Sequence, residues 1–163
     1  MSASPSTSPQ GLSVTTPGER EIRTERTFDA DRQLVWRALT EPELVAQWWG
    51  RGNKLIIERL ELEKGGHWRF VEHSEQGVHG FEGRYREVAP PERIVMTFEW
   101  DGMPGHTVLE TVELEDLGDG RTRVVNTSLF FTTEERDGML AAGMEQGLAE
   151  SYVALDALLG RVG

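Results

Sequence analysis

The chain has 163 residues, a net charge of −11 and an isoelectric point of about 4.8, and its length suits one domain. This acidity argues against nucleic acid and anionic membrane surfaces as partners, because proteins bind both through basic faces. The absence of cysteine excludes disulfides, thiolate nucleophiles and cysteine-based zinc sites. No apolar stretch is long enough to span a membrane, and residues 1–18 lack the features of a signal peptide, so we expect a cytoplasmic protein.

Residues 1–20 predict a disordered arm, since three prolines lie there among small polar residues that cannot form a core. We expect one folded domain over residues 21–163. It begins with a strand over 22–28, followed by two short helices. Asp29 is expected to cap the first helix, and a capping box at Thr40, with Pro42 in the first turn, is expected to open the second.

The middle of the chain alternates strand-like runs with turn residues. Six strands are expected, over residues 55–63, 67–73, 78–88, 93–100, 107–115 and 122–131. Their short links favour an antiparallel meander. A long final helix is expected from Thr132, with Glu135 completing its capping box and a buried stripe running to Leu159. This order of elements predicts an α+β fold in which one sheet face and the final helix bury each other.

Several segments of this pattern belong together: residues 27–30 (TFDA), 35–40 (VWRALT), 48–50 (WWG), 65–66 (GG), 83–93 (GRYREVAPPER) and 97–100 (TFEW). With these segments the chain, from about residue 21 to 159, resembles the heat-shock ATPase activator-homologue branch of the SRPBCC/START-like superfamily. The resemblance implies the helix-grip fold, in which a curved antiparallel sheet wraps a long C-terminal helix around an apolar cavity, and often a homodimer. Members of the superfamily bind lipids, sterols, polyketides and hormones, and some are cyclases or hydrolases, so the implied partner is a small hydrophobic ligand.

Alternation with a period of two assigns the side chains that face this cavity. The expected wall from the strands consists of Trp68, Phe70, Phe81, Tyr85, Met96 and Phe98, and the alternative is that these side chains simply fill a core. The final helix is expected to contribute Met144, Gly147, Leu148, Ser151 and Tyr152. Gly143, Gly147 and Ser151 form a stripe of small residues, which indicates either close packing of the helix on the sheet or room for a ligand.

Glu110 and Asn126 stand where the family prefers apolar residues. If Val112 pairs with Val124, Glu110 lies directly opposite Asn126 on the inner face. A buried carboxylate is costly unless it is paired, protonated or used. We therefore hypothesise that Glu110 and Asn126, with Tyr152 and Ser151, form the polar end of the pocket, where Glu110 accepts a hydrogen bond or acts as a general base. The alternatives are a register that differs by one residue, or a Glu110 that is solvated at the cavity mouth.

Three functions remain open at this stage. They are binding of a small hydrophobic molecule, an acid–base enzyme with Glu110 as its catalytic residue, and a co-chaperone-like interaction module. The third rests on an exposed patch at Trp48 and Trp49, and the alternative is that both rings are packed. The four histidines lack metal-ligand spacing, and the glycines at 118 and 120 lead into a strand rather than a helix, so we expect neither a metal site nor a cofactor.

Overall fold

Nine strands and four helices make up the part of the chain that the computed structural model describes, residues 6–7 and 11–163. In chain order they are β1 (Ser6–Thr7), β2 (Ser13–Thr15), β3 (Glu21–Phe28), α1 (Arg32–Thr40), α2 (Pro42–Trp48), β4 (Lys54–Leu60), β5 (His67–Ser74), β6 (Gly77–Ala89), β7 (Arg93–Trp100), β8 (Val108–Gly118), β9 (Arg121–Leu129), α3 (Thr133–Ala141) and α4 (Met144–Val162). None of the helices in this described part is long and apolar enough to cross a membrane.

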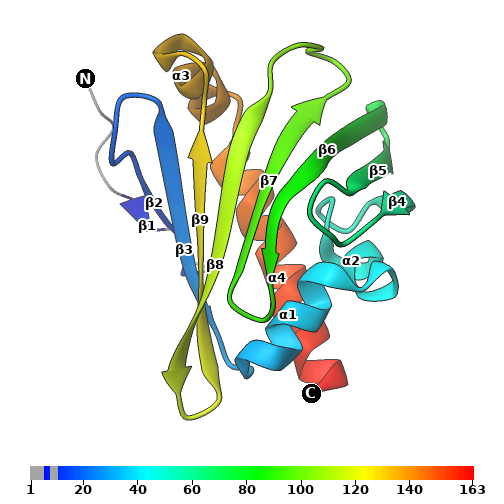
Figure 1. Cartoon of the computed structure of the whole chain (residues 1–163), viewed down its shortest axis with the longest axis vertical. Helices are drawn as coiled ribbons and strands as arrows, with labels where there is room; N and C mark the ends of the chain where they lie inside the picture. The colour runs from blue at the N-terminus through cyan, green and yellow to red at the C-terminus, as the bar shows by residue number, and fades with distance from the viewer. Residues whose placement is uncertain (1–5, 8–10) are drawn as a thin grey trace.

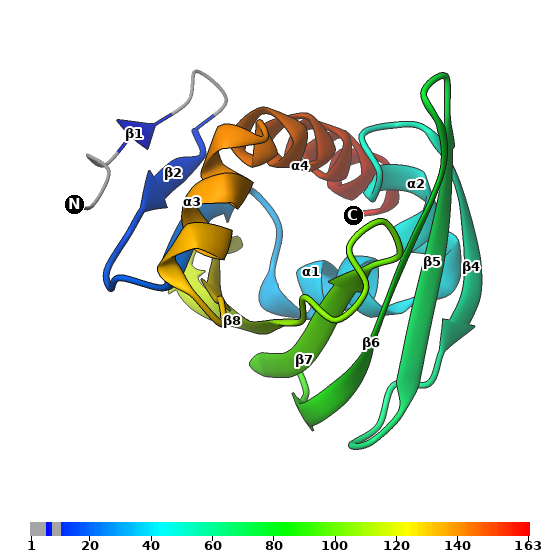
Figure 2. The ribbon, with the colours of Figure 1, turned by 90° about the horizontal axis from the view of Figure 1, so that it is seen from above.

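The strands form one antiparallel sheet in the order β1-β2-β3-β9-β8-β7-β6-β5-β4. Strands β4 to β9 follow one another as the predicted meander, and β3 completes the arrangement by pairing with β9. The sheet is curved, and α4 lies along its concave side (Figure 1). Seen from above, the strands wrap around α4 from one flank to the other, while α2 lies beside β4 and β5 (Figure 2). The predicted α+β helix-grip fold is confirmed.

The predicted disordered arm needs correction where the structure describes it. Strand β2 pairs with β3 in antiparallel register, and Leu12 and Val14 are buried in the core. The apolar area of these two side chains stabilises a segment whose own composition does not favour a strand. The rest of the predicted arm, residues 1–5 and 8–10, lies outside the described residues.

The two short helices form where they were expected, but their caps differ. Asp31, and not Asp29, caps α1 by accepting a hydrogen bond from the backbone N–H of Leu34 at 2.9 Å. Helix α2 begins after Glu41, which makes no side-chain cap, and the expected cap Thr40 is instead the last residue of α1, where its hydroxyl donates to the carbonyl of Trp36. Pro42 occupies the first turn of α2, as predicted, where its missing N–H leaves no hydrogen bond unmade.

The predicted single C-terminal helix is two helices. Thr132 caps α3 by accepting a hydrogen bond from the backbone N–H of Glu135 at 3.1 Å, as expected. The helix then ends at Ala141, and Gly143 adopts the left-handed conformation, with φ of 85°, before α4 begins. Glycine reaches this conformation at no steric cost, so Gly143 is a hinge between helices and not part of a helical stripe.

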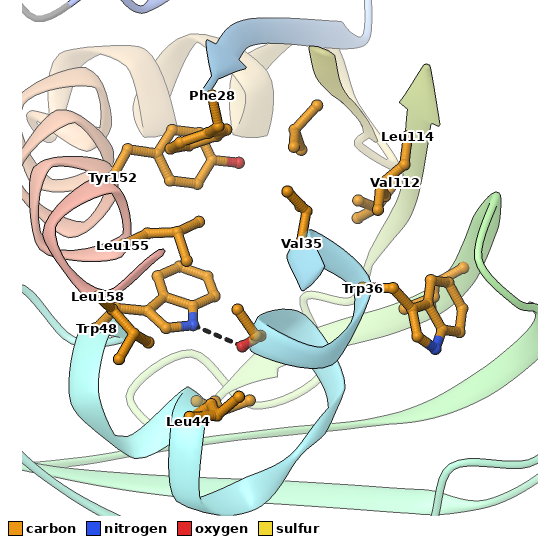
Figure 3. Packing of buried hydrophobic residues seen from close by; sticks show 14 of the residues in the cluster. Phe28, Val35, Trp36, Leu44, Trp48, Val112, Leu114, Tyr152, Leu155 and Leu158 are labelled. Carbon is orange, nitrogen blue, oxygen red and sulfur yellow. Dashed lines mark hydrogen bonds between the residues drawn. The ribbon is translucent and has the colours of Figure 1, made fainter. Parts of the chain in front are cut away.

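The core lies between the concave face of the sheet and the helices (Figure 3). Phe28 of β3 packs edge to face against Tyr152 of α4, with ring centres 5.3 Å apart. Trp48 is buried, and its indole N–H donates to the carbonyl of Ala38 at 2.8 Å (Figure 3). Trp49 lies against Phe70 and Phe81 of the sheet. Packing is therefore the outcome for both tryptophans, and they do not form an exposed patch.

Candidate functional site

Glu110 lies on the concave face of β8, as predicted, although its neighbour across the ladder differs. Its direct partner on β9 is Ser128, and Asn126 is opposite Val112. The pairing is shifted by two residues from the predicted one because the hairpin turns at Asp119 and a bulge follows Asp116. A shift of two residues keeps every side chain on its predicted face, whereas a shift of one would have reversed them. Glu110 and Asn126 are therefore diagonal neighbours on the same face.

A polar cluster on this face surrounds Glu110. The hydroxyl of Ser128 donates a hydrogen bond to the Glu110 carboxylate at 2.6 Å. Thr24 of β3 lies directly opposite Asn126. The hydroxyl oxygen of Thr24 and the amide oxygen of Asn126 are buried without a hydrogen-bond partner among the described residues. Buried polar atoms are rarely left unpaired, so these two are candidates for contact with a bound molecule.

Burial raises the pKa of the Glu110 carboxyl to about 7, although the side chains of Ser128 and Asn126 act in the opposite direction. The pKa of Tyr152 is raised by burial first and by the negative charge of Glu110 second. Tyr152 of α4 therefore lies within electrostatic reach of Glu110, and its hydroxyl points away from the helix into the core (Figure 3). A carboxyl group with this pKa exists in both protonation states near neutral pH.

Three members of the expected wall are core residues. Trp68, Phe70 and Tyr85 are buried, and Trp68 contacts Phe70 with ring centres 4.9 Å apart. The indole N–H of Trp68 donates to the carbonyl of Thr97 at 3.1 Å. It reaches that carbonyl over Gly83, where a Cβ atom would lie 1.8 Å from the same oxygen. At this end of the sheet the rings therefore fill the core, which was the alternative to a cavity wall.

Five further residues of the expected wall keep accessible surface despite facing the interior. They are Phe81, Met96 and Phe98 from the sheet and Met144 and Leu148 from α4. Met96 is the direct neighbour of Glu110 across the β7–β8 ladder. The half-buried apolar side chains and the polar cluster thus adjoin each other on the concave face.

Gly147 and Ser151 of α4 lie against the loop that follows α2. The hydroxyl of Ser151 accepts a hydrogen bond from the backbone N–H of Arg51 at 3.1 Å. A Cβ atom on Gly147 would meet the Arg51 side chain at 3.3 Å and no atom of the sheet. Arg51 also pairs with the buried carboxylate of Glu72, to which Asn53 donates at 2.6 Å. Gly147 and Ser151 therefore both contact this loop rather than the sheet, and Ser151 has a partner other than Glu110.

An open hollow of about 490 Å³ lies elsewhere, between the β7–β8 loop and the start of α3. It is lined by Gly105, His106, Thr107, Phe131, Thr132, Glu134 and Glu135. Its titratable pair is already satisfied, since His106 contacts Glu135 at 2.5 Å. The concave face is the stronger candidate for a site because its polar atoms are buried and lack partners.

Two residues of the cluster, Ser128 and Thr24, were not among the site residues expected from the sequence. Both follow from strand alternation. Thr24 shares a face with the buried Ile22 and Phe28 of β3. Alternation therefore indicated that Thr24 faces inward. The predicted meander did not, however, indicate that β3 lies beside β9, which is what brings Thr24 next to Asn126.

The fold and the site define a class: an α+β helix-grip domain whose curved sheet presents a polar cluster toward its C-terminal helix. The family model described as Activator of Hsp90 ATPase homolog 1-like protein matches residues 29–160. The chain therefore belongs to this family, which is part of the SRPBCC superfamily, as the sequence resemblance indicated. No curated protein matches the chain.

Solved structures share the fold over nearly the whole chain. A crystal structure of a Rhodobacter sphaeroides protein is 27% identical with a TM-score of 0.85, over 93% of this chain and 99% of that one. A solution structure of an Arthrobacter aurescens protein is 25% identical with a TM-score of 0.82, over 91% of both chains. A Mycobacterium smegmatis protein, 14% identical over 98% of this chain and 97% of that one, has a TM-score of 0.78 and supports the fold alone.

Proposed function

We propose that this protein binds a small hydrophobic molecule between the concave face of the sheet and α4, with the polar end of the molecule at Glu110. The observation that carries the proposal is the polar cluster itself. Thr24 and Asn126 have buried oxygen atoms without partners, beside a carboxyl whose pKa burial raises to about 7. A domain that needed only stability would gain by apolar residues at these positions, because unpaired buried polar groups are costly.

The apolar side chains around the cluster support the same proposal. Phe81, Met96 and Phe98 face the helix yet remain half-buried, and so do Met144 and Leu148 on α4. Large apolar residues on the inner face of a domain are usually fully packed. Their residual accessible surface is what a hydrophobic ligand would cover, and covering it would be favourable.

Native mass spectrometry of the purified protein, before and after denaturation, tests the proposal. We expect a non-covalent adduct that is lost on denaturation, or, in an initially empty protein, an equimolar adduct with added 1-naphthalenemethanol. Met144→Trp should reduce the adduct because a larger side chain fills the space beside α4. Met103→Trp, in an exposed loop, is the matched control. A protein that carries no adduct under either condition would show that the proposal is wrong.

A second candidate is an enzyme that acts on the bound molecule by acid–base chemistry. The raised pKa of Glu110, about 7, favours it, because a group that titrates near neutral pH transfers protons efficiently. In this role Glu110 would be the catalytic base and Ser128 would orient its carboxylate. Masses of the molecules released from wild type and from Glu110→Gln test this idea. Turnover predicts substrate on the variant and product on the wild type, whereas identical masses from both would exclude it.

The co-chaperone-like alternative loses its support from the sequence. It required Trp48 and Trp49 to be exposed, but Trp48 is buried and Trp49 packs on two phenylalanines. Trp48 is therefore out of reach of a partner protein, and the part of Trp49 that stays accessible is too small to form the expected patch.

A further inference from the structure

Glu110 has no positively charged partner on the described part of the chain. No arginine, lysine or histidine there forms an ion pair with it, and the groups that hydrogen-bond to it, the Ser128 hydroxyl and the Asn126 amide, are both neutral. Arg26 of β3 is the nearby cation, and it is engaged with the Phe28 ring at 4.5 Å and with Asp156 at 3.9 Å. Glu110 keeps some accessible surface, but its carboxylate is largely removed from solvent and has no countercharge, which is costly. A cation supplied from outside would remove that cost.

The unpaired atoms next to Glu110 are also suited to accepting hydrogen bonds. The amide of Asn126 stabilises the charged form of Glu110, which requires its N–H side to face the carboxylate. This orientation directs the amide oxygen elsewhere, and that oxygen is buried without a partner. The hydroxyl oxygen of Thr24, on the adjacent strand, is unpaired as well. Three acceptors, from Glu110, Asn126 and Thr24, therefore adjoin one another.

A primary ammonium group has three N–H donors and one positive charge, which matches these three acceptors and the missing countercharge. An anionic head group would meet the charge of Glu110 with the same sign. A neutral alcohol could use only one acceptor as a donor. The apolar side chains beside the cluster, Met96 and Phe98 among them, suit an apolar body on the same molecule.

We propose that the ligand is a hydrophobic primary amine, whose ammonium group pairs with the Glu110 carboxylate and donates hydrogen bonds to Asn126 and Thr24. This inference rests on the proposed function and specifies the ligand class for that site. Other titratable groups that face the cluster are Arg26 of β3 and Tyr152 of α4. Arg26 is balanced by Asp156, and Tyr152 is uncharged at neutral pH, as any tyrosine is, while burial raises its pKa further.

Isothermal titration of the full chain at pH 8 with three matched probes tests the inference. The probes are 1-naphthylmethylamine, 1-naphthalenemethanol and 1-naphthoate, which share an apolar body and differ in the head group. We expect the amine to bind at least about tenfold more tightly than the alcohol, and the carboxylate to bind most weakly. Lowering the pH to 5.5 should remove the preference for the amine, because Glu110 then takes up a proton.

Glu110→Gln should lower the affinity for the amine about tenfold and leave the affinity for the alcohol nearly unchanged. Glu113→Gln is the matched control, since Glu113 lies on the same strand with its side chain on the outer face, paired with Arg93. The wild-type probe series alone decides the matter if a variant does not fold. Equal binding of amine and alcohol would overturn this inference but not the proposed function, whereas no binding of any probe would overturn both.

Discussion

The carboxyl group of Glu110 should make the stability of this protein depend on pH in a direction opposite to that of most carboxylates. Its pKa rises from 4.5 in the unfolded chain to about 7 in the folded one. The folded state therefore holds the proton more tightly than the unfolded state. The resulting contribution of Glu110 to the free energy of unfolding is fully present below about pH 4.5 and is lost as the pH rises through 7. Between pH 5 and pH 8 the loss amounts to about 2 to 3 kcal/mol.

Glu110→Gln isolates this effect because glutamine has nearly the same shape and cannot ionise. Urea unfolding of wild type and variant, measured from pH 5 to pH 8, gives the difference in the free energy of unfolding at each pH. We expect the variant to gain about 2 to 3 kcal/mol on wild type across this range. The control Glu113→Gln, on the outer face, should show no such trend. A difference for Glu110→Gln that stays constant with pH would refute the assignment of a partly buried carboxyl group that lacks a countercharge.

Three further substitutions test the packing, each by the free energy of unfolding in urea. Gly83→Ala should destabilise by about 2 kcal/mol or more, because its Cβ would lie 1.8 Å from a carbonyl oxygen; Gly138→Ala, in open space on α3, should be neutral or stabilising, and equal effects would contradict the account. Leu12→Ala should lower the free energy of unfolding by about 3 kcal/mol, since this leucine is 0% exposed. An unchanged free energy of unfolding would instead support the disordered arm expected from the sequence. Trp48→Phe should lower the free energy of unfolding by about 1 to 2 kcal/mol by removing the indole hydrogen bond. An unchanged value would contradict that contact.

Much of the fold could be predicted because one strong signal dominates it. The strands from β4 to β9 alternate apolar and polar residues over short stretches separated by glycine and proline turns, so their order and faces follow directly. The inward position of Glu110 was predicted by the same alternation. It survived an incorrect partner assignment, because a shift of two residues preserves the face of every side chain.

The parts that were predicted incorrectly depend on tertiary contacts. Leu12 and Val14 are two apolar residues in a polar segment, and only the edge of β3 and the core beneath it turn that segment into a strand. The break before α4 depends on the left-handed backbone of Gly143, and glycine is compatible with either a continuous helix or a hinge. Thr24 joins the site only because β3 pairs with β9, a contact between distant segments.

Methionine-methyl NMR tests most directly the claim that the interior beside Glu110 binds an apolar molecule. Met96 and Met144 border the proposed site, whereas Met103 is exposed in the loop between β7 and β8 and serves as an internal control. On titration of ¹³C-methyl-methionine-labelled protein with 1-naphthalenemethanol, we predict saturable shifts at Met96 and Met144 and none at Met103. Shifts confined to Met103, or none at Met96 and Met144 up to the solubility of the probe, would contradict the account.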